Sequence, residues 1–174
     1  GKMLADELGT RSFRPYLAND VIGAEIGGAI KNVLAIACGI VEGRKLGDNA
    51  RAALITRGLA EMVRLAVAKG GRAETLMGLS GLGDLVLTCT ATQSRNYSLG
   101  LALGQGRALR AVIGERVSVA EGVESAAAAA LLAQRLVIDM PITATVNAIL
   151  HRGAAIDDAI AALLSRPRKS EAGN

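Results

Sequence analysis

Apolar residues recur at helical spacing through most of this chain, and glycine or polar residues mark the ends of the apolar segments. Residues 19–41 show the pattern best: Asn19 and Asp20 are suited to cap a helix, and the apolar run continues to Val41. On the same grounds we expect helices at residues 2–9, 48–69, 93–103, 107–113, 122–136, 142–151 and 156–164, with Pro141 at a favoured first helical position. The pattern therefore predicts an all-α, multi-helix domain.

Three segments depart from this pattern. Residues 10–18 hold a proline and two of the three aromatic residues of the chain, which favours an extended strand. Residues 137–142 are a weaker strand candidate. Residues 76–92 space Leu and Ser with three glycines, which predicts an irregular segment. The leader 1–18 therefore differs in character from the helical body that follows it.

The composition narrows the classes of partner. The 174 residues suffice for one domain with a real core, which must be aliphatic because the hydrophobic fraction is 51% and the aromatic fraction only 2%. The formal net charge of +4 suits anionic ligands, but nucleic acid is a poor candidate because the chain has few aromatic side chains to stack on bases. Residues 166–174, a short basic run with a polar end, are predicted to form a disordered tail.

Residues 21–41 have the length of a membrane span, yet Glu25 and Lys31 lie within them, which favours a buried helix of a soluble protein over membrane insertion. No signal peptide is visible. Cys38 and Cys89 lie in apolar runs without metal-ligand spacing. We interpret both as reduced, buried cysteines of a cytosolic protein, with a disulfide between them as the open alternative.

Lys31 is the first candidate for chemistry, because its neighbours one helical turn away are small and apolar. One interpretation is a lysine whose stem is buried and whose amine reaches the surface. The other is an ammonium beside a cavity, placed to donate and accept a proton. Asp84 is likewise either a turn or cap residue or a carboxylate that orients this ammonium.

The segment Ser94-Arg95-Asn96 is the second candidate, because a helix that starts here would present free N–H groups to an anion. Arg95 adds a permanently charged fork suited to phosphate, although an ordinary helix cap with an exposed arginine has the same sequence. The run GLSGLGD lacks the Lys-Ser/Thr of a phosphate-binding P-loop. His151 is the only histidine, so we expect neither a histidine-based catalytic site nor a metal site.

Several blocks of the sequence resemble one known family when taken together. GAEIGGAIKNVLAIACGIVEGRKLGDNARAALITRGLAEM, GLSGLGDLVLTCTATQSRN, VAEGVESA and DMPIT are similar, in order and spacing, to the C-terminal half of bacterial NAD(P)-dependent glycerol-3-phosphate dehydrogenase. The resemblance covers about residues 13–165 and implies a helical domain like the C-terminal domain of 6-phosphogluconate dehydrogenase. It divides the chain into the end of an N-terminal Rossmann domain (1–18), a helical substrate domain (19–165) and a tail (166–174).

The resemblance also implies roles for individual residues. Lys31 matches the catalytic lysine of the family. The glycerol phosphate site is matched by Lys31, Asp84, Ser94, Arg95 and Asn96. Positions that approach the cofactor are matched by Arg95, Val119 and Glu121. Asn32 and Thr88 match residues that lie beside the site in related eukaryotic enzymes.

The activity implied by the resemblance is interconversion of sn-glycerol 3-phosphate and dihydroxyacetone phosphate with NAD or NADP, with Lys31 as general acid and base. We expect a cytoplasmic homodimer that serves phospholipid synthesis, and no activity from this chain alone, since the glycine-rich dinucleotide fingerprint does not occur in it. The choice between NAD and NADP stays open. The alternatives are a separate helical module that binds a phosphorylated metabolite, and a dimerisation domain.

Overall fold

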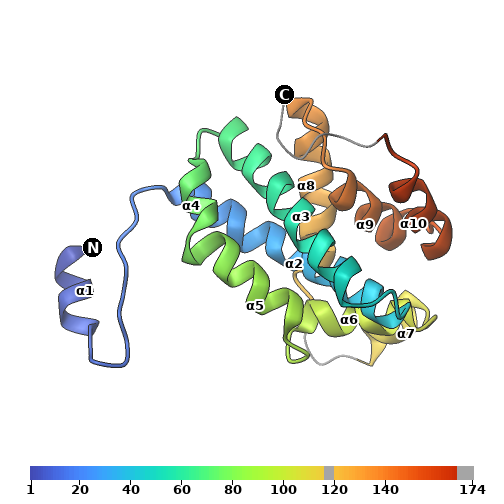
Figure 1. Ribbon diagram of the computed structural model, residues 1–174, viewed down its shortest axis with the longest axis horizontal. Helices are drawn as coiled ribbons and strands as arrows, with labels where there is room; N and C mark the ends of the chain where they lie inside the picture. Colours follow the sequence, from blue (N-terminus) through green and yellow to red (C-terminus); the bar gives the residue numbers. More distant parts are fainter. Residues whose placement is uncertain (116–119, 168–174) are drawn as a thin grey trace.

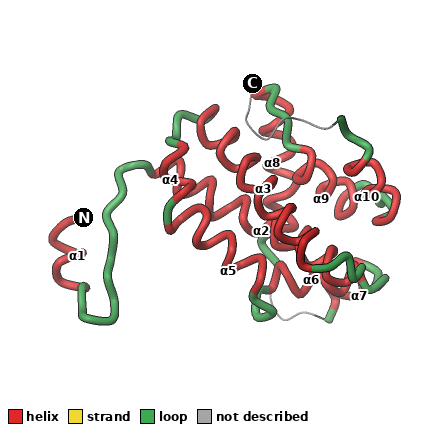
Figure 2. The backbone as a smooth tube through the Cα atoms, viewed as in Figure 1, coloured by secondary structure: helices red, strands yellow, loops and turns green. Residues whose placement is uncertain are grey.

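The computed structural model describes residues 1–115 and 120–167, and the regular structure within these ranges is entirely helical (Figure 2). The elements in chain order are α1 (Lys2–Leu8), α2 (Val21–Gly43), α3 (Asp48–Ala68), α4 (Ala73–Met77), the π-helix η1 (Leu79–Gly83), α5 (Asp84–Thr90), α6 (Arg95–Gly104), α7 (Leu109–Gly114), α8 (Gly122–Leu136), α9 (Pro141–His151) and α10 (Ile156–Leu164). The predicted all-α fold class is confirmed.

Helix α2 runs through the middle of the helical body and packs against α3, α5, α6 and α8 (Figure 1). It is long and apolar enough to cross a membrane, but half of its most apolar window is buried by the surrounding helices, as in the core helix of a soluble domain. Glycines bring α6 against it: a Cβ on Gly39 would lie 2.1 Å from the Tyr97 carbonyl oxygen, and one on Gly100 would lie 2.0 Å from that of Ile36. The two backbones therefore touch, which fixes α6 relative to α2.

Two buried carboxylates accept hydrogen bonds from backbone N–H groups at helix starts and so connect segments that are distant in the sequence. Asp20 caps α2 by accepting from the Gly23 N–H at 2.9 Å, as its sequence position predicts, and it also accepts from the Arg72 N–H at 2.9 Å. Glu61 of α3 is 1% exposed and accepts hydrogen bonds from the backbone of Ile142 and Thr143 at the start of α9. Burial raises the pKa of Glu61, and these hydrogen bonds oppose the rise.

The strand expected at residues 10–18 is wrong. Residues 10–18 form no regular secondary structure, because a strand needs a neighbour to pair with and the described part of the chain holds no strand. They connect α1, which buries none of its residues, to α2, and Figure 1 shows α1 set apart from the other helices. The weaker candidate at 137–142 is also wrong, because left-handed Val137 ends α8 and Pro141 begins α9.

The irregular segment expected at residues 76–92 is instead largely helical, formed by η1 and α5. Gly81 is required for close packing rather than for a chain break, because a Cβ there would lie 2.1 Å from the Leu76 carbonyl oxygen. Leu85 and Cys89, four residues apart on α5, are both fully buried.

Both cysteines are buried and free, which agrees with the prediction that they are reduced. A hydrogen bond with Cys38 and burial raise the pKa of the Cys89 thiol. Both side chains are fully buried, as is typical of cysteines that serve as small apolar core residues.

Candidate functional site

An ion pair between α2 and the start of α5 forms the centre of the candidate site. The Lys31 Nζ lies 2.5 Å from the Asp84 Oδ2, and the two side chains are 23% and 33% exposed. Thr88, one turn after Asp84, donates its hydroxyl to the Asp84 carbonyl oxygen at 2.6 Å and approaches its Oδ1 at 3.4 Å. A half-buried ammonium is thus held in a fixed orientation at a point that solvent or a ligand can reach.

The local packing explains why these two distant residues meet. Gly27 of α2 lets the π-helix η1 approach, because a Cβ on Gly27 would lie 2.4 Å from the Ser80 carbonyl oxygen. Direct contact between η1 and α2 places Asp84, the first residue of α5, beside the next turn of α2, where Lys31 lies. The close approach that Gly27 allows therefore helps to position the ion pair.

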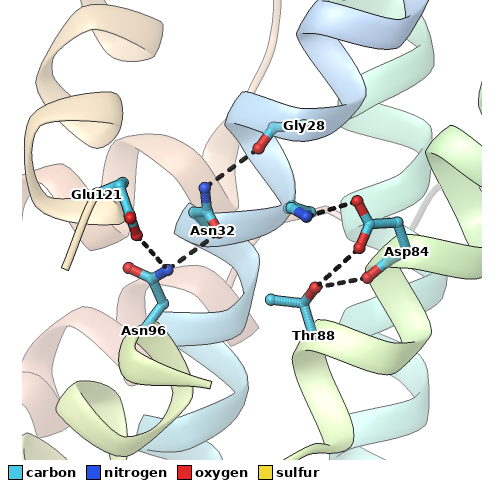
Figure 3. Close-up of polar contacts among 7 residues, drawn as sticks. Gly28, Asn32, Asp84, Thr88, Asn96 and Glu121 are labelled. Carbon is cyan, nitrogen blue, oxygen red and sulfur yellow. Dashed lines mark hydrogen bonds and ion pairs between the residues drawn. The ribbon is translucent and has the colours of Figure 1, made fainter. Parts of the chain in front are cut away.

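A chain of amide hydrogen bonds lies next to this ion pair (Figure 3). Asn32 donates from its Nδ2 to the Gly28 carbonyl oxygen at 3.1 Å and accepts at its Oδ1 from the Asn96 Nδ2 at 3.0 Å. Asn96, which is 3% exposed, accepts at its Oδ1 from the Gly122 N–H at 2.9 Å. Because Gly122 can only donate here, it fixes the orientation of both side-chain amides.

Arg95 and Glu121 form the exposed edge of the same region. The Arg95 Nη2 lies 2.5 Å from the Glu121 Oε1, and both side chains are 52% exposed. The backbone N–H of Glu121 and the Arg95 guanidinium lower the pKa of Glu121. Ser94 caps α6 by accepting from the Tyr97 N–H at 3.3 Å. The first turn of α6 therefore carries a half-exposed guanidinium next to the free N–H groups of the helix start, an arrangement that attracts anions.

The structure brings the predicted residues into two adjoining groups. Lys31 and Asp84 meet with Thr88, and Asn32 meets Asn96, which also approaches the Glu121 Oε2 at 3.5 Å. Ser94 and Arg95 begin α6, as predicted, while Val119 lies outside the described residues.

Sequence reasoning did not single out Gly122. A Cβ on it would lie 2.8 Å from the Asn96 Oδ1, and the signal for it was the glycine that follows Glu121 in the VAEG block. His151 contacts the Val123 carbonyl oxygen at 2.9 Å. Residues 1–115 and 120–167 contain no group of three or more metal-ligating side chains that could hold an ion.

Comparison with known proteins identifies the family. A family model described as the C-terminus of NAD-dependent glycerol-3-phosphate dehydrogenase matches residues 20–161. The chain belongs to this family. The resemblance stated from the sequence blocks is thereby confirmed.

Relatives of this family member match it over nearly its whole length. It is 64% identical to glycerol-3-phosphate dehydrogenase (NAD(P)+) of Rhodospirillum rubrum over 96% of this chain and 48% of the relative, and 60% identical to that of Caulobacter vibrioides over 99% and 52%. The crystal structure of glycerol-3-phosphate dehydrogenase from Coxiella burnetii superposes with a TM-score of 0.90 at 50% identity, over 95% of this chain and 51% of that one. The chain therefore spans about half the length of the curated relatives that it matches.

Proposed function

We propose that this chain acts as the C-terminal, substrate-binding half of a glycerol-3-phosphate dehydrogenase that interconverts dihydroxyacetone phosphate and sn-glycerol 3-phosphate with NAD(P)H or NAD(P)+. The contact between the Lys31 Nζ and the Asp84 Oδ2 carries the proposal, because it holds a partly exposed ammonium in place for proton transfer. Family membership and the names of the relatives support the choice of reaction.

Lys31 manages the proton at the C2 oxygen of the substrate. When the ketone is reduced, this oxygen gains negative charge, which the ammonium stabilises and then neutralises by donating a proton. In the reverse direction the neutral amine accepts the hydroxyl proton. Asp84 orients the amine through the 2.5 Å contact, and Thr88 holds the Asp84 backbone and carboxylate in place.

The start of α6 binds the phosphate of the substrate. Arg95 supplies a guanidinium that is half exposed, and Ser94 supplies a hydroxyl. The Asn96 side chain is buried and already bonded to Asn32 and Gly122, so its backbone N–H, at the second position of α6, is the group that remains for the phosphate. Asn32 and Asn96 thus hold the phosphate end and the lysine end of the site in register.

NAD(P)H, when bound, supplies the hydride for C2. The residues at the exposed edge fit this group: the Arg95 guanidinium suits phosphate oxygens, and the Glu121 carboxylate, which its own N–H and Arg95 keep ionised, suits hydroxyl or amide donors. The N-terminal half of the enzyme would supply the dinucleotide fold. The enzyme would work as a cytoplasmic homodimer in phospholipid synthesis, with residues 1–18 ending the N-terminal domain and 19–165 forming the substrate domain.

The experiment is NAD(P)H oxidation driven by dihydroxyacetone phosphate, in the full-length enzyme that contains this chain and in its Lys31→Ala variant. We expect turnover by the wild type and a loss of about 10²- to 10⁴-fold in kcat on substitution, the usual contribution of a positioned acid or base. Wild-type protein without turnover would contradict the proposed reaction. Full turnover by the variant would contradict only the role given to Lys31 and would leave the proposed reaction standing.

A further inference from the structure

Helix α2 contains five glycines, and four of them have a packing reason. A Cβ on Gly23, Gly27, Gly39 or Gly43 would lie 2.1 to 2.5 Å from another atom of the protein. Gly28 differs from these four, because a Cβ there would meet nothing within 4 Å among the described residues. The packing of this chain therefore does not explain why Gly28 is glycine.

Backbone conformation does not explain Gly28 either. Four other described glycines with open space around them, at positions 47, 70, 106 and 153, adopt positive φ angles that disfavour other residues. Gly28 lies within the regular part of a 23-residue helix, where alanine would be the more stable residue. A glycine at this position destabilises the helix, and no contact within the described residues compensates for this.

The open space at Gly28 lies on the face of α2 that carries the candidate site. Gly28 precedes Lys31 by three residues and Asn32 by four, so all three share one face of α2. Its carbonyl oxygen accepts the hydrogen bond that orients Asn32, as Figure 3 shows. A side chain at position 28 would stand on this same face of α2, where no described atom lies within 4 Å of its Cβ.

We infer that Gly28 is a specificity-determining residue of the site, whose missing side chain leaves room for the three-carbon skeleton of the substrate. The inference rests on the proposed function. The C2 oxygen must come within hydrogen-bond distance of the Lys31 Nζ, so the carbons next to it must lie close to the surface of α2. A methyl group on Gly28 would occupy that space, whereas the phosphate end of the substrate, at the start of α6, would be unaffected.

The test compares the full-length enzyme with its Gly28→Ala and Gly28→Val variants. The matched control is Gly114→Ala, the other described glycine that has open space and no positive φ, which lies on α7. For each protein we would measure kcat, the KM for dihydroxyacetone phosphate, the KM for NAD(P)H and the melting temperature. The Gly28 variants should fold, because both substitutions replace glycine within a helix by residues of higher helix propensity.

We expect Gly28→Ala to lower kcat/KM for dihydroxyacetone phosphate by about 10- to 200-fold, the range for one methyl group placed in a binding pocket. Gly28→Val should lower kcat/KM further. The melting temperature of Gly28→Ala should stay equal or rise, because alanine has the higher helix propensity. Its KM for NAD(P)H should change by less than about twofold. Gly114→Ala should match the wild type in all four quantities. Loss of activity together with higher stability would not arise from a structural role.

Three results would overturn the inference. If Gly28→Ala turns over dihydroxyacetone phosphate like the wild type, the space is not used by the substrate. If the KM for NAD(P)H rises instead, the cofactor occupies it. If the wild type itself has no turnover, the proposed function fails and this inference fails with it, so the two failures are distinguishable.

Discussion

Two carboxylates in this helical body, Glu61 and Asp84, show how surroundings separate a structural role from a chemical one. Glu61 is 1% exposed, and its two oxygens accept three hydrogen bonds from the start of α9, at 2.6, 3.0 and 2.8 Å. Asp84 is one-third exposed. Its Oδ2 contacts the Lys31 ammonium, but its Oδ1 receives only a long hydrogen bond of 3.4 Å from Thr88. A saturated, buried carboxylate holds the fold together, whereas a half-open one that orients an ammonium can take part in chemistry.

The largest expected difference between the two is in activity. Asp84→Asn keeps the shape of the side chain but removes the charge that orients Lys31, so we expect kcat of the full-length enzyme to fall about 10²- to 10³-fold. The melting temperature should change little, because the ion pair is partly exposed. Steady-state kinetics and thermal unfolding check this, with Asp158→Asn, at an exposed position, as the control. An Asp84→Asn enzyme with normal kcat would remove Asp84 from the site.

The reverse pattern is expected for Glu61. In Glu61→Gln one oxygen becomes an NH₂ group that must face the N–H of Ile142 or the donors of Thr143, so a buried donor loses its acceptor. We expect the free energy of unfolding to fall by about 2–4 kcal/mol, measured by urea denaturation, with kcat/KM of the folded enzyme unchanged. Exposed Glu74→Gln should stay within about 0.5 kcal/mol of the wild type. An effect of Glu61→Gln on turnover but not on stability would break the comparison.

A third carboxylate, Asp20, sharpens the comparison through pH. Hydrogen bonds from Thr75, Gly23 and Arg72 hold the pKa of Asp20 below its usual 3.8. A carboxyl group with a lowered pKa contributes stability that is present above its unfolded pKa and is lost as the pH falls through its folded one. Between about pH 5 and pH 2, the wild type should therefore lose more stability than Asp20→Asn, measured as urea midpoints. Equal pH slopes in the two proteins would contradict this account of Asp20.

Local sequence patterns predict the helices well where caps and glycines act locally. The ranges 122–136 and 156–164 coincide with α8 and α10, and Asp20 caps α2 as expected. Helix α5 is missed because Gly81 and Gly83 suggest a chain break, although Gly81 serves a close contact with Leu76. A local pattern does not reveal which contact a glycine makes in three dimensions.

In the candidate site, too, the sequence predicts some features and leaves others to be found only in the structure. The resemblance of the sequence blocks identifies Lys31 and Asp84 together, and the structure brings them within 2.5 Å. It does not reveal that the Asn96 side chain is buried and bonded to Asn32, because that depends on how α6 crosses α2. The burial of Glu61 is equally hidden, since its partners lie about 80 residues further along the chain.

The most direct test of the central claim asks whether Lys31 supplies the proton through its amine. We would measure reduction of dihydroxyacetone phosphate by the full-length Lys31→Ala enzyme with and without added ethylamine, which can enter the space left by the lysine. Turnover that is lost in the variant and returns in proportion to the ethylamine concentration is the predicted result. A Lys31→Ala enzyme that reduces the substrate at the wild-type rate without any amine would contradict it.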